Sequence, residues 1–327
     1  IIIVKREKRV DKAQSGIYAE PNLHGLTLFC HVMSDDVESL RRKLSRFPAI
    51  IQDLDARFSE AMLTGFVGIG AEYWDILYPH KRPLHLQAFP ELSDADREAP
   101  RHPFDLVLHI RCDRFDANYL AGRTIMEWFG YDIEVAEQIR SFRYLDGRDL
   151  LGFIDAPDNP RGMRKREASL INATDDTAFV DGSYLFVQKI RYDLRRWDYL
   201  GPEKQEQIMG REKVSGERLP EAMIDGVTHA AKAKLMDKNE QPIPLLRQNM
   251  PWGDLREQGL LGMYFSHAPK SVVEWLKARY YADEQGQYDP ILDYSQAVLN
   301  SSFFVPSTRF LLENRELPVN QEDGSTD

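Results

Sequence analysis

The sequence has 327 residues, with 42 Lys and Arg against 52 Asp and Glu, and its formal net charge is −10. At about 100–200 residues per domain, this length predicts about two domains. Hydrophobic residues make up 43% of the chain, which excludes a wholly disordered protein. No run approaches the ~20 apolar residues of a membrane span. We therefore expect no membrane partner, and because the basic residues form no continuous stripe, we expect no nucleic-acid partner either.

Cysteine content and the opening residues favour a cytoplasmic protein. Two cysteines, Cys30 and Cys112, are too few for a disulfide scaffold. Each lies in or beside an apolar, strand-like run, which predicts a buried thiol that packs as a small hydrophobe. The apolar run at residues 1–4 is too short for the hydrophobic region of a signal peptide.

The first half of the chain predicts two units in which strands and helices alternate. Residues 24–33 form an apolar, β-rich run, and Ser34 is a candidate N-cap for a following helix. Residues 61–70 and 104–111 predict two further strands, and residues 116–128 predict a second helix. The core face of the first helix is predicted to carry Val37, Leu40, Leu44 and Phe47.

The second half repeats this order. Residues 184–190 predict a strand, and residues 194–209 a broken helical stretch. Residues 260–266 predict another strand, followed by a helix that Ser271 would cap.

The repeat has a nearly constant offset. Pairing Leu28 with Phe186 gives 158 residues, and pairing Leu108 with Tyr264 gives 156 residues. Two strand–helix units at nearly the same offset indicate two similar α+β halves. The turn-rich segment that begins at Tyr144 predicts the boundary between them.

Three segments of the second half carry side chains that folding alone does not require. Asp155 lies in a loop at 152–160 that is rich in Pro and Asx residues, so it is either an Asx turn or cap or a general base. His229 has no His or Cys at zinc-site spacing, so it is either structural or the single ligand of a haem iron. Arg247, inside an apolar run, either reaches solvent or meets a buried anion.

These segments, in this order, resemble the dye-decolorizing peroxidase (DyP-type) family of haem enzymes. The resemblance extends over nearly the whole chain. Its strongest parts are FRYLD at 142–146 leading into the loop at 152–160, then His229, then RQNMP at 247–251. Weaker parts are QSGI at 14–17, the glycines of 65–70, and LDYS followed by FFVP near the end.

The resemblance implies an α+β fold of two ferredoxin-like domains, with antiparallel sheets packed together. The boundaries would be 1–143 for the N-terminal domain and 144–313 for the C-terminal domain, with a disordered tail at 314–327. The C-terminal domain would bind haem b. The implied activity is oxidation of dyes, phenolics or similar organic donors by hydrogen peroxide in one-electron steps. A homo-oligomer is also implied.

On the proximal side of the haem, the resemblance implies His229 as the iron ligand. Asp293 would accept the other ring N–H of His229, which would orient the imidazole and make it more basic. Arg211 is a candidate partner for a haem propionate.

On the distal side, the resemblance implies three polar residues. Asp155 would take a proton from hydrogen peroxide and return it to the departing oxygen. Arg247 would stabilise the negative charge that develops as the O–O bond breaks. Asn249 would order distal water or peroxide. One departure concerns Ala156, which replaces a family glycine next to Asp155, so either the loop avoids positive φ there or Asp155 is displaced.

Two other classes of function remain open from the sequence. A haem-handling protein, which releases iron from porphyrin or senses haem, could use the same fold and His229. An interaction protein could retain the fold without a cofactor.

Overall fold

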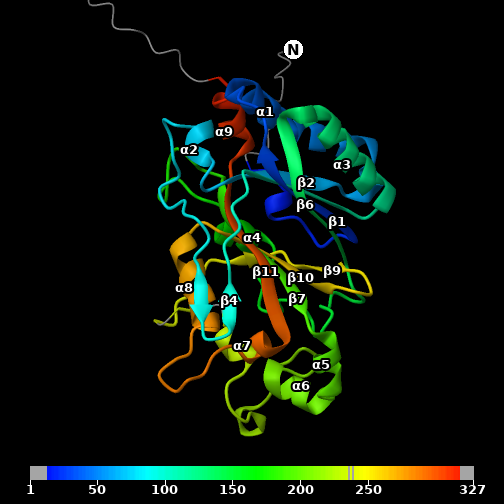
Figure 1. Ribbon diagram of the computed structural model, residues 1–327, viewed down its shortest axis with the longest axis vertical. Coiled ribbons are helices and arrows are strands. Elements are labelled where there is room, and N and C mark those ends of the chain that lie inside the picture. Colours follow the sequence, from blue (N-terminus) through cyan, green and yellow to red (C-terminus); the bar gives the residue numbers. More distant parts are fainter. Residues whose placement is uncertain (1–12, 235, 238, 317–327) are drawn as a thin grey trace, which may run out of the picture.

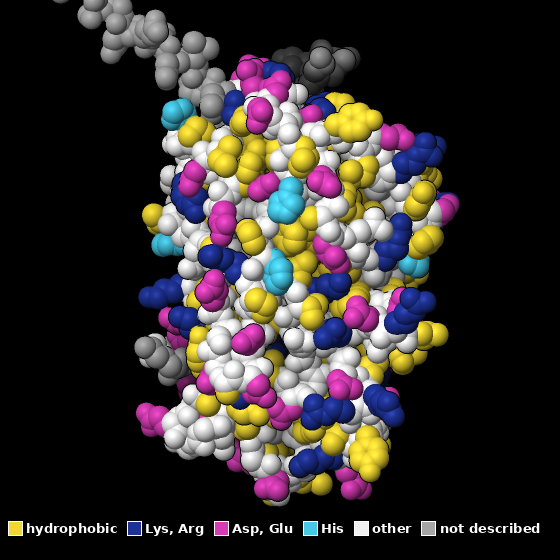
Figure 2. All heavy atoms as spheres, in the orientation of Figure 1, with side chains coloured by type: hydrophobic (Ala, Val, Ile, Leu, Met, Phe, Trp, Pro, Cys, Tyr) yellow, Lys and Arg dark blue, Asp and Glu magenta, His cyan; other side chains and the backbone are white. Residues whose placement is uncertain are grey.

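The computed structural model describes residues 13–234, 236–237 and 239–316. Residues 1–12, and residues 317–327 of the predicted tail, lie outside this part of the chain. Within it, no helix is both long enough and apolar enough to cross a membrane. On the face shown in Figure 2, acidic and basic side chains are interspersed, without a continuous basic stripe.

The first half forms a four-stranded antiparallel sheet covered on one face by two helices. Its spatial order is β2-β5-β1-β6, which is the order of a ferredoxin-like fold. The two covering helices pack on this sheet and on each other. The strands are β1 (His24–Val32), β2 (Thr64–Gly70), β5 (Leu106–Cys112) and β6 (Ile133–Phe142), and the helices are α1 (Val37–Arg57) and α3 (Phe115–Phe129).

The second half repeats this arrangement with its own four positions. The order is β11-β7-β10-β9, and the short β8 also pairs with β10. The strands are β7 (Ser183–Tyr192), β8 (Leu246–Arg247), β9 (Met250–Gly253), β10 (Gln258–Ser266) and β11 (Ser295–Val305). The helices are α4 (Met163–Ser169), α5 (Leu194–Tyr199), α6 (Pro202–Met209), α7 (His229–Lys232) and α8 (Pro269–Tyr280). Leu28 and Phe186 lie on the first strands of the two halves, so the repeat seen in the sequence is a structural one.

The two sheets join at both edges into one closed sheet. At one edge β2 pairs with β11, where Gly70 lies opposite Phe303, and at the other edge β6 pairs with β9 through Ser141 and Trp252. Side chains from both sheets fill the interior, and this cluster includes Phe29, Phe66, Val107, Val187, Met263 and Phe303. The fold is therefore two ferredoxin-like α+β halves whose sheets pack on each other and share their edges.

Each half also contributes an element to the other. The hairpin of β3 (Leu92–Asp94) and β4 (Arg97–Ala99) packs on α8 and β11, and α9 (Thr308–Glu313) packs on α1. Figure 1 shows the cyan hairpin reaching down to α8 and the red α9 beside α1 at the top. A further short helix, α2 (Trp74–Leu77), also contacts α1.

Successive residues of β1 point to opposite faces of the sheet, and this alternation places Cys30 on the face that the helices cover. Along β1, Leu28 and Cys30 pack toward the helices, whereas Phe29 points into the space between the sheets. Cys30 and Cys112 are both buried and free, as the sequence predicts. Burial raises the pKa of the Cys30 thiol to about 12, so this thiol is not a nucleophile at neutral pH.

Two predicted helix caps are wrong. The N-cap of α1 is Asp36, whose carboxylate accepts a hydrogen bond from the Ser39 backbone N–H at 2.8 Å. Ser34 instead accepts from the Asp36 backbone N–H. Ser271 lies inside α8, because Pro269 already has the fixed φ that suits a first helical position.

Candidate active site

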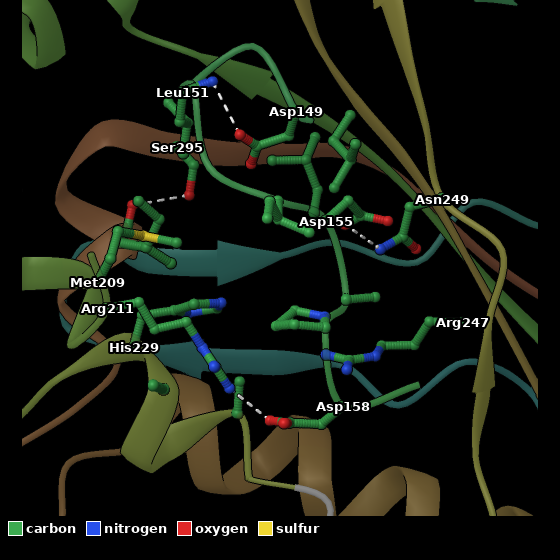
Figure 3. A pocket seen from close by; sticks show the side chains of 18 of the residues that line it. Asp149, Leu151, Asp155, Asp158, Met209, Arg211, His229, Arg247, Asn249 and Ser295 are labelled. Atoms are coloured by element: carbon green, nitrogen blue, oxygen red, sulfur yellow. Dashed lines mark hydrogen bonds and ion pairs between the residues drawn. The ribbon is translucent and has the colours of Figure 1, made fainter. Parts of the chain in front are cut away.

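A pocket lies against the sheet of the second half, between α7, α8 and the loop at 149–158 (Figure 3). It measures about 820 Å³ including the part open to solvent. Figure 3 shows Arg247 and Asn249 on one side of it and His229 and Arg211 on the other. Its apolar walls include Ile154, Ile190, Met209, Leu260 and Ile291.

His229 is the first residue of the four-residue helix α7. The Thr228 hydroxyl caps this helix by accepting a hydrogen bond from the Ala231 backbone N–H at 3.2 Å. Behind Thr228 lies Gly210, where an added Cβ would come within 2.5 Å of the Thr228 hydroxyl oxygen. A glycine at this position therefore allows the close approach that places His229 in the pocket.

The partner of His229 is Asp289. His229 Nδ1 lies 2.9 Å and 3.0 Å from the two carboxylate oxygens of Asp289, which is fully buried. The prediction that Asp293 fills this role is wrong. Asp293 is exposed and accepts a hydrogen bond from the Tyr288 hydroxyl at 2.8 Å. Asp289 precedes Pro290 at the start of a 3-10 helix, and that turn points Asp289 inward and Asp293 outward.

Asp289 is held as an anion. Burial acts to raise its pKa, but His229 and the Arg279 guanidinium outweigh burial and hold the pKa below its usual value. Arg279 Nε donates to the carboxylate at 2.7 Å. Because an ionised carboxylate only accepts hydrogen bonds, His229 Nδ1 is the donor, and Nε2 is the ring nitrogen left for a ligand.

Asp155 lies on the opposite side of the pocket in the loop after Gly152. Its backbone N–H donates to the Gly147 carbonyl at 3.2 Å, which ties the loop to the preceding turn. The next residue, Ala156, has a φ of +46° and so lies in the left-handed region. The loop therefore keeps the conformation that favours glycine although an alanine occupies it.

Asn249 and Asn159 connect this loop to β8 and the segment after it. Asn249 Nδ2 donates to the Asp155 carboxylate at 2.9 Å. Asn159 donates to the Arg247 carbonyl at 2.7 Å and accepts from the Arg247 backbone N–H at 2.9 Å. These bonds hold Asp155, Asn249 and Arg247 together.

Burial dominates the electrostatics of the distal pair. It raises the pKa of Asp155 above its usual value, although the Asn249 hydrogen bond and the positive charge of Arg247 oppose the shift. Burial also lowers the pKa of Arg247, against the attraction of Asp155. A carboxyl group with a raised pKa exchanges protons more readily near neutral pH than an ordinary aspartate does.

A second buried carboxyl group lines the pocket beside this pair. Asp149 accepts from the backbone N–H of Leu151 at 3.0 Å and from the Tyr192 hydroxyl at 3.3 Å. Burial, followed by the negative charge of Asp155, raises the pKa of Asp149 to about 7.

Arg211 also lines the pocket, but it already has partners. Its guanidinium donates to the Asp158 carboxylate at 2.5 Å and to the Gly216 carbonyl at 2.9 Å. Arg218 reaches the same carboxylate at 3.2 Å.

Polar atoms that line the pocket lack partners in the described part of the chain. They are Arg247 Nε, Asn249 Oδ1 and Trp275 Nε1, all without solvent contact. Buried polar groups normally form hydrogen bonds. Among the described residues there is also no cluster of His, Cys, Asp or Glu that would hold a bare metal ion. His229 and these unpartnered polar atoms are therefore available to a group bound in the pocket.

Comparison with known families agrees with this geometry. The model of the Dyp-type peroxidase N-terminal domain matches residues 14–143, and that of the Dyp-type peroxidase C-terminal domain matches residues 146–310. The chain belongs to the DyP-type peroxidase family.

Individual DyP-type relatives cover most of the chain. The dye-decolorizing peroxidase of Mycobacterium tuberculosis is 32% identical over 89% of this chain and 87% of its own. The crystal structure of a putative DyP-type peroxidase from Shewanella oneidensis has a TM-score of 0.89 at 38% identity, covering 93% of this chain and 98% of that one. A variant of DypB from Rhodococcus jostii RHA1, in complex with heme, has a TM-score of 0.86 at 30% identity, covering 92% and 98%.

The activity is thus that of a haem peroxidase, and the cofactor is haem. The pocket of this DyP-type chain fits that group. His229 Nε2 is available to the iron, the walls are apolar, and the unpartnered Arg247 and Asn249 atoms lie on the face opposite His229.

Sequence reasoning missed Asp289, Asn159 and Asp149. Asp289 is followed by Pro290, and this Asp-Pro step was the available signal for a turn that points a carboxylate inward. The pairing of Asn159 with Arg247 spans 88 residues, so no local pattern shows it.

Proposed function

We propose that Asp155, Arg247 and Asn249 perform the peroxide chemistry of this DyP-type haem peroxidase and that His229 holds the iron. The boundaries that we propose are 1–143 for the N-terminal domain and 144–313 for the haem domain. When bound, haem supplies an iron that is oxidised by hydrogen peroxide and re-reduced by organic donors in one-electron steps.

Asp155 moves the proton. Its carboxylate would accept a proton from one oxygen of hydrogen peroxide and return it to the other oxygen as the O–O bond breaks. The Asn249 amide donates to one carboxylate oxygen at 2.9 Å and leaves the other available for peroxide. Because burial raises the pKa of Asp155, its carboxylate accepts a proton more readily than an ordinary aspartate does.

Arg247 supplies fixed positive charge. Asn159 anchors its backbone on both sides, so the guanidinium keeps its position while negative charge develops on the departing oxygen. The buried surroundings exclude water and so strengthen this interaction. On the other face, Asp289 keeps the His229 imidazole oriented and electron-rich.

We also propose that Arg211 contacts a haem propionate. It lies in the pocket wall beside His229. Asp158 would then share this guanidinium with the propionate.

Arg247→Leu tests the distal assignment. We expect the peroxide-dependent change in haem absorbance to slow by about 10²–10³-fold, because one preorganised stabilising group is lost, while the haem content stays unchanged. The control is Arg195→Leu, since Arg195 is exposed on α5. A native rate in Arg247→Leu would contradict the assignment of Arg247.

A haem-handling role is the alternative that the same pocket allows. It predicts release of iron-free porphyrin without added peroxide, which product analysis detects. The hydrogen-bonded Asp155–Asn249 pair, with Arg247 beside it, favours peroxide chemistry, because porphyrin binding alone requires no proton-transfer group.

The remaining partners are proposals of the same kind. We propose hydrogen peroxide as the oxidant, small organic reductants such as dyes and phenolics as donors, a homo-oligomeric state and a cytoplasmic location. Two free buried cysteines are compatible with a reducing compartment.

A further inference from the structure

A second hollow adjoins the haem pocket on its distal side. It shares Asp155, Ala156, Arg247 and Asn249 with that pocket and measures about 1300 Å³ including the part open to solvent. Its other walls come from residues 19–22, from the turn at 142–148 and from the segment at 159–165. We call this hollow the distal vestibule.

The vestibule is rich in positive charge although the chain carries a net charge of −10. Its cations are Arg111, Arg143, Arg148, Arg161, Lys165 and Arg247, and its carboxylates are Glu20, Asp146 and Asp155. Two of the cations are paired, Arg148 with Asp146 at 2.8 Å and Lys165 with Glu20 at 2.7 Å. The other four make no ion pair with a described residue.

Of the two cations at the base, Arg111 is buried and Arg247 is partly buried. Arg111 is 4% exposed, its guanidinium donates to the Gln248 side chain, and its Nε has no partner in the described chain. Burial lowers its pKa to about 10, which still leaves it charged at neutral pH. Arg247 Nε is likewise buried without a partner. Such groups are costly to bury unless an anion compensates them.

The two remaining cations lie at the rim. Arg161 is exposed, and no side-chain contact holds it among the described residues. Arg143 is exposed and makes a long bond of 3.4 Å to the Asp146 carbonyl. Both guanidinium groups are therefore free to meet a ligand at the mouth.

Peroxide chemistry uses Arg247 but does not require the other cations. Hydrogen peroxide is uncharged at neutral pH, whereas a positive field concentrates anions. A carboxylate matches the planar donor fork of a guanidinium. We propose that the distal vestibule is a binding site for a small carboxylate anion, which Arg161 and Arg143 attract and Arg111 and Arg247 face from below.

Benzoate and its neutral analogue benzamide test this proposal by calorimetry on the full-length, haem-loaded protein. Benzoate is expected to bind, benzamide is not, and the affinity for benzoate is expected to fall with added salt. In the double variant Arg143→Gln/Arg161→Gln we expect affinity to fall about tenfold, since two nearby charges are lost. The control is Arg195→Gln/Arg256→Gln, which removes two exposed cations outside the vestibule and should leave affinity unchanged.

The measurement does not require turnover, so it can fail or succeed independently of the proposed peroxidase mechanism. Unchanged benzoate affinity in the Arg143/Arg161 variant, or equal binding of benzamide, would overturn the proposal. So would a benzoate-induced shift of the haem absorption spectrum that persists in that variant, because benzoate would then be bound at the iron.

Discussion

Asp289 shows how one buried residue controls the proximal side of the site. Its carboxylate accepts from His229, from Arg279 and, at 3.2 Å, from the Ile291 backbone N–H. All three donors satisfy a fully buried anion, which would otherwise be strongly unfavourable. The bonds from Arg279 and Ile291 fix the carboxylate that orients the His229 ring, so ligand orientation and local stability depend on one group.

Asp289→Asn should weaken haem binding about 10–100-fold, the usual effect of losing such a partner of a metal ligand. The amide keeps the shape of the side chain but removes the negative charge opposite His229 and Arg279. A haem titration followed by absorbance measures the effect. Asp293→Asn is the matched control, because Asp293 is exposed and makes no contact with His229. Equal losses in both variants would exclude the assignment of Asp289.

Ala156→Gly should raise the free energy of unfolding by about 1 kcal/mol, because alanine is strained at positive φ and glycine is not. Ala95→Gly is a matched comparison, since Ala95 has a φ of +56° in the turn between β3 and β4. Urea unfolding should show a similar gain for both variants. A loss of stability in Ala156→Gly would mean that no strain is stored in the loop.

Asp149→Asn should remove part of the pH dependence of stability. The pKa of Asp149 is raised from 3.8 to about 7 in the folded state, so the native state binds the proton more tightly than the unfolded state does. The free energy of unfolding of the native sequence therefore falls as pH rises from about 4 to about 7. The amide lacks this proton and should show a smaller fall in urea unfolding at pH 4.5 and pH 8. An unchanged fall would show that Asp149 does not titrate in this range.

At the scale of elements, two of the site residues lie on very short elements, His229 on α7 and Arg247 on β8. Helix α7 has four residues and β8 has two, so neither is stable alone. Each is held by contacts with distant segments, α7 by the Thr228 cap against Gly210 and β8 by Asn159. The long strands of the two sheets were predictable from their apolar runs, whereas these short elements follow from tertiary contacts.

Gly210→Ala should displace Thr228, because the added Cβ would clash with it, and should therefore lower haem affinity. A glycine-to-alanine change at positive φ without such a clash should lower haem affinity less. Gly201→Ala is the matched control, since Gly201 has a φ of +75°, close to the +71° of Gly210, but an added Cβ there meets nothing within 4 Å. Both variants should lose about 1 kcal/mol of stability from positive φ. We expect Gly210→Ala to show the larger loss and to lower haem affinity in an absorbance titration. Equal haem affinity in the two variants would contradict the role given to Gly210.

At the scale of the whole molecule, the closed sheet makes the two halves depend on each other. Gln14 bridges them: its amide donates to the Val67 carbonyl at 3.0 Å and to the Pro306 carbonyl at 2.8 Å. Its oxygen accepts from the Val67 backbone N–H at 2.9 Å. The side chain thus joins β2 of the first half to the end of β11 in the second.

Gln14→Ala should lower the free energy of unfolding by about 2–3 kcal/mol, because it leaves buried backbone groups of both halves unsatisfied. Gln52→Ala, on the exposed side of α1, should change it by less than about 0.5 kcal/mol. Denaturant unfolding compares the two variants. A negligible effect in Gln14→Ala would show that the bridge does not couple the halves.

The sequence by itself determined the strands, the two similar halves, and the residue types at His229, Asp155, Arg247 and Asn249, because apolar periodicity and local motifs depend on neighbouring residues. Tertiary structure decided the rest. It selected Asp289 over Asp293, placed Ala156 at positive φ, and joined the two sheets at their edges. These outcomes depend on which distant segments meet and on the burial that results. Burial also sets the raised pKa values of Asp155 and Asp149, which no residue type alone reveals.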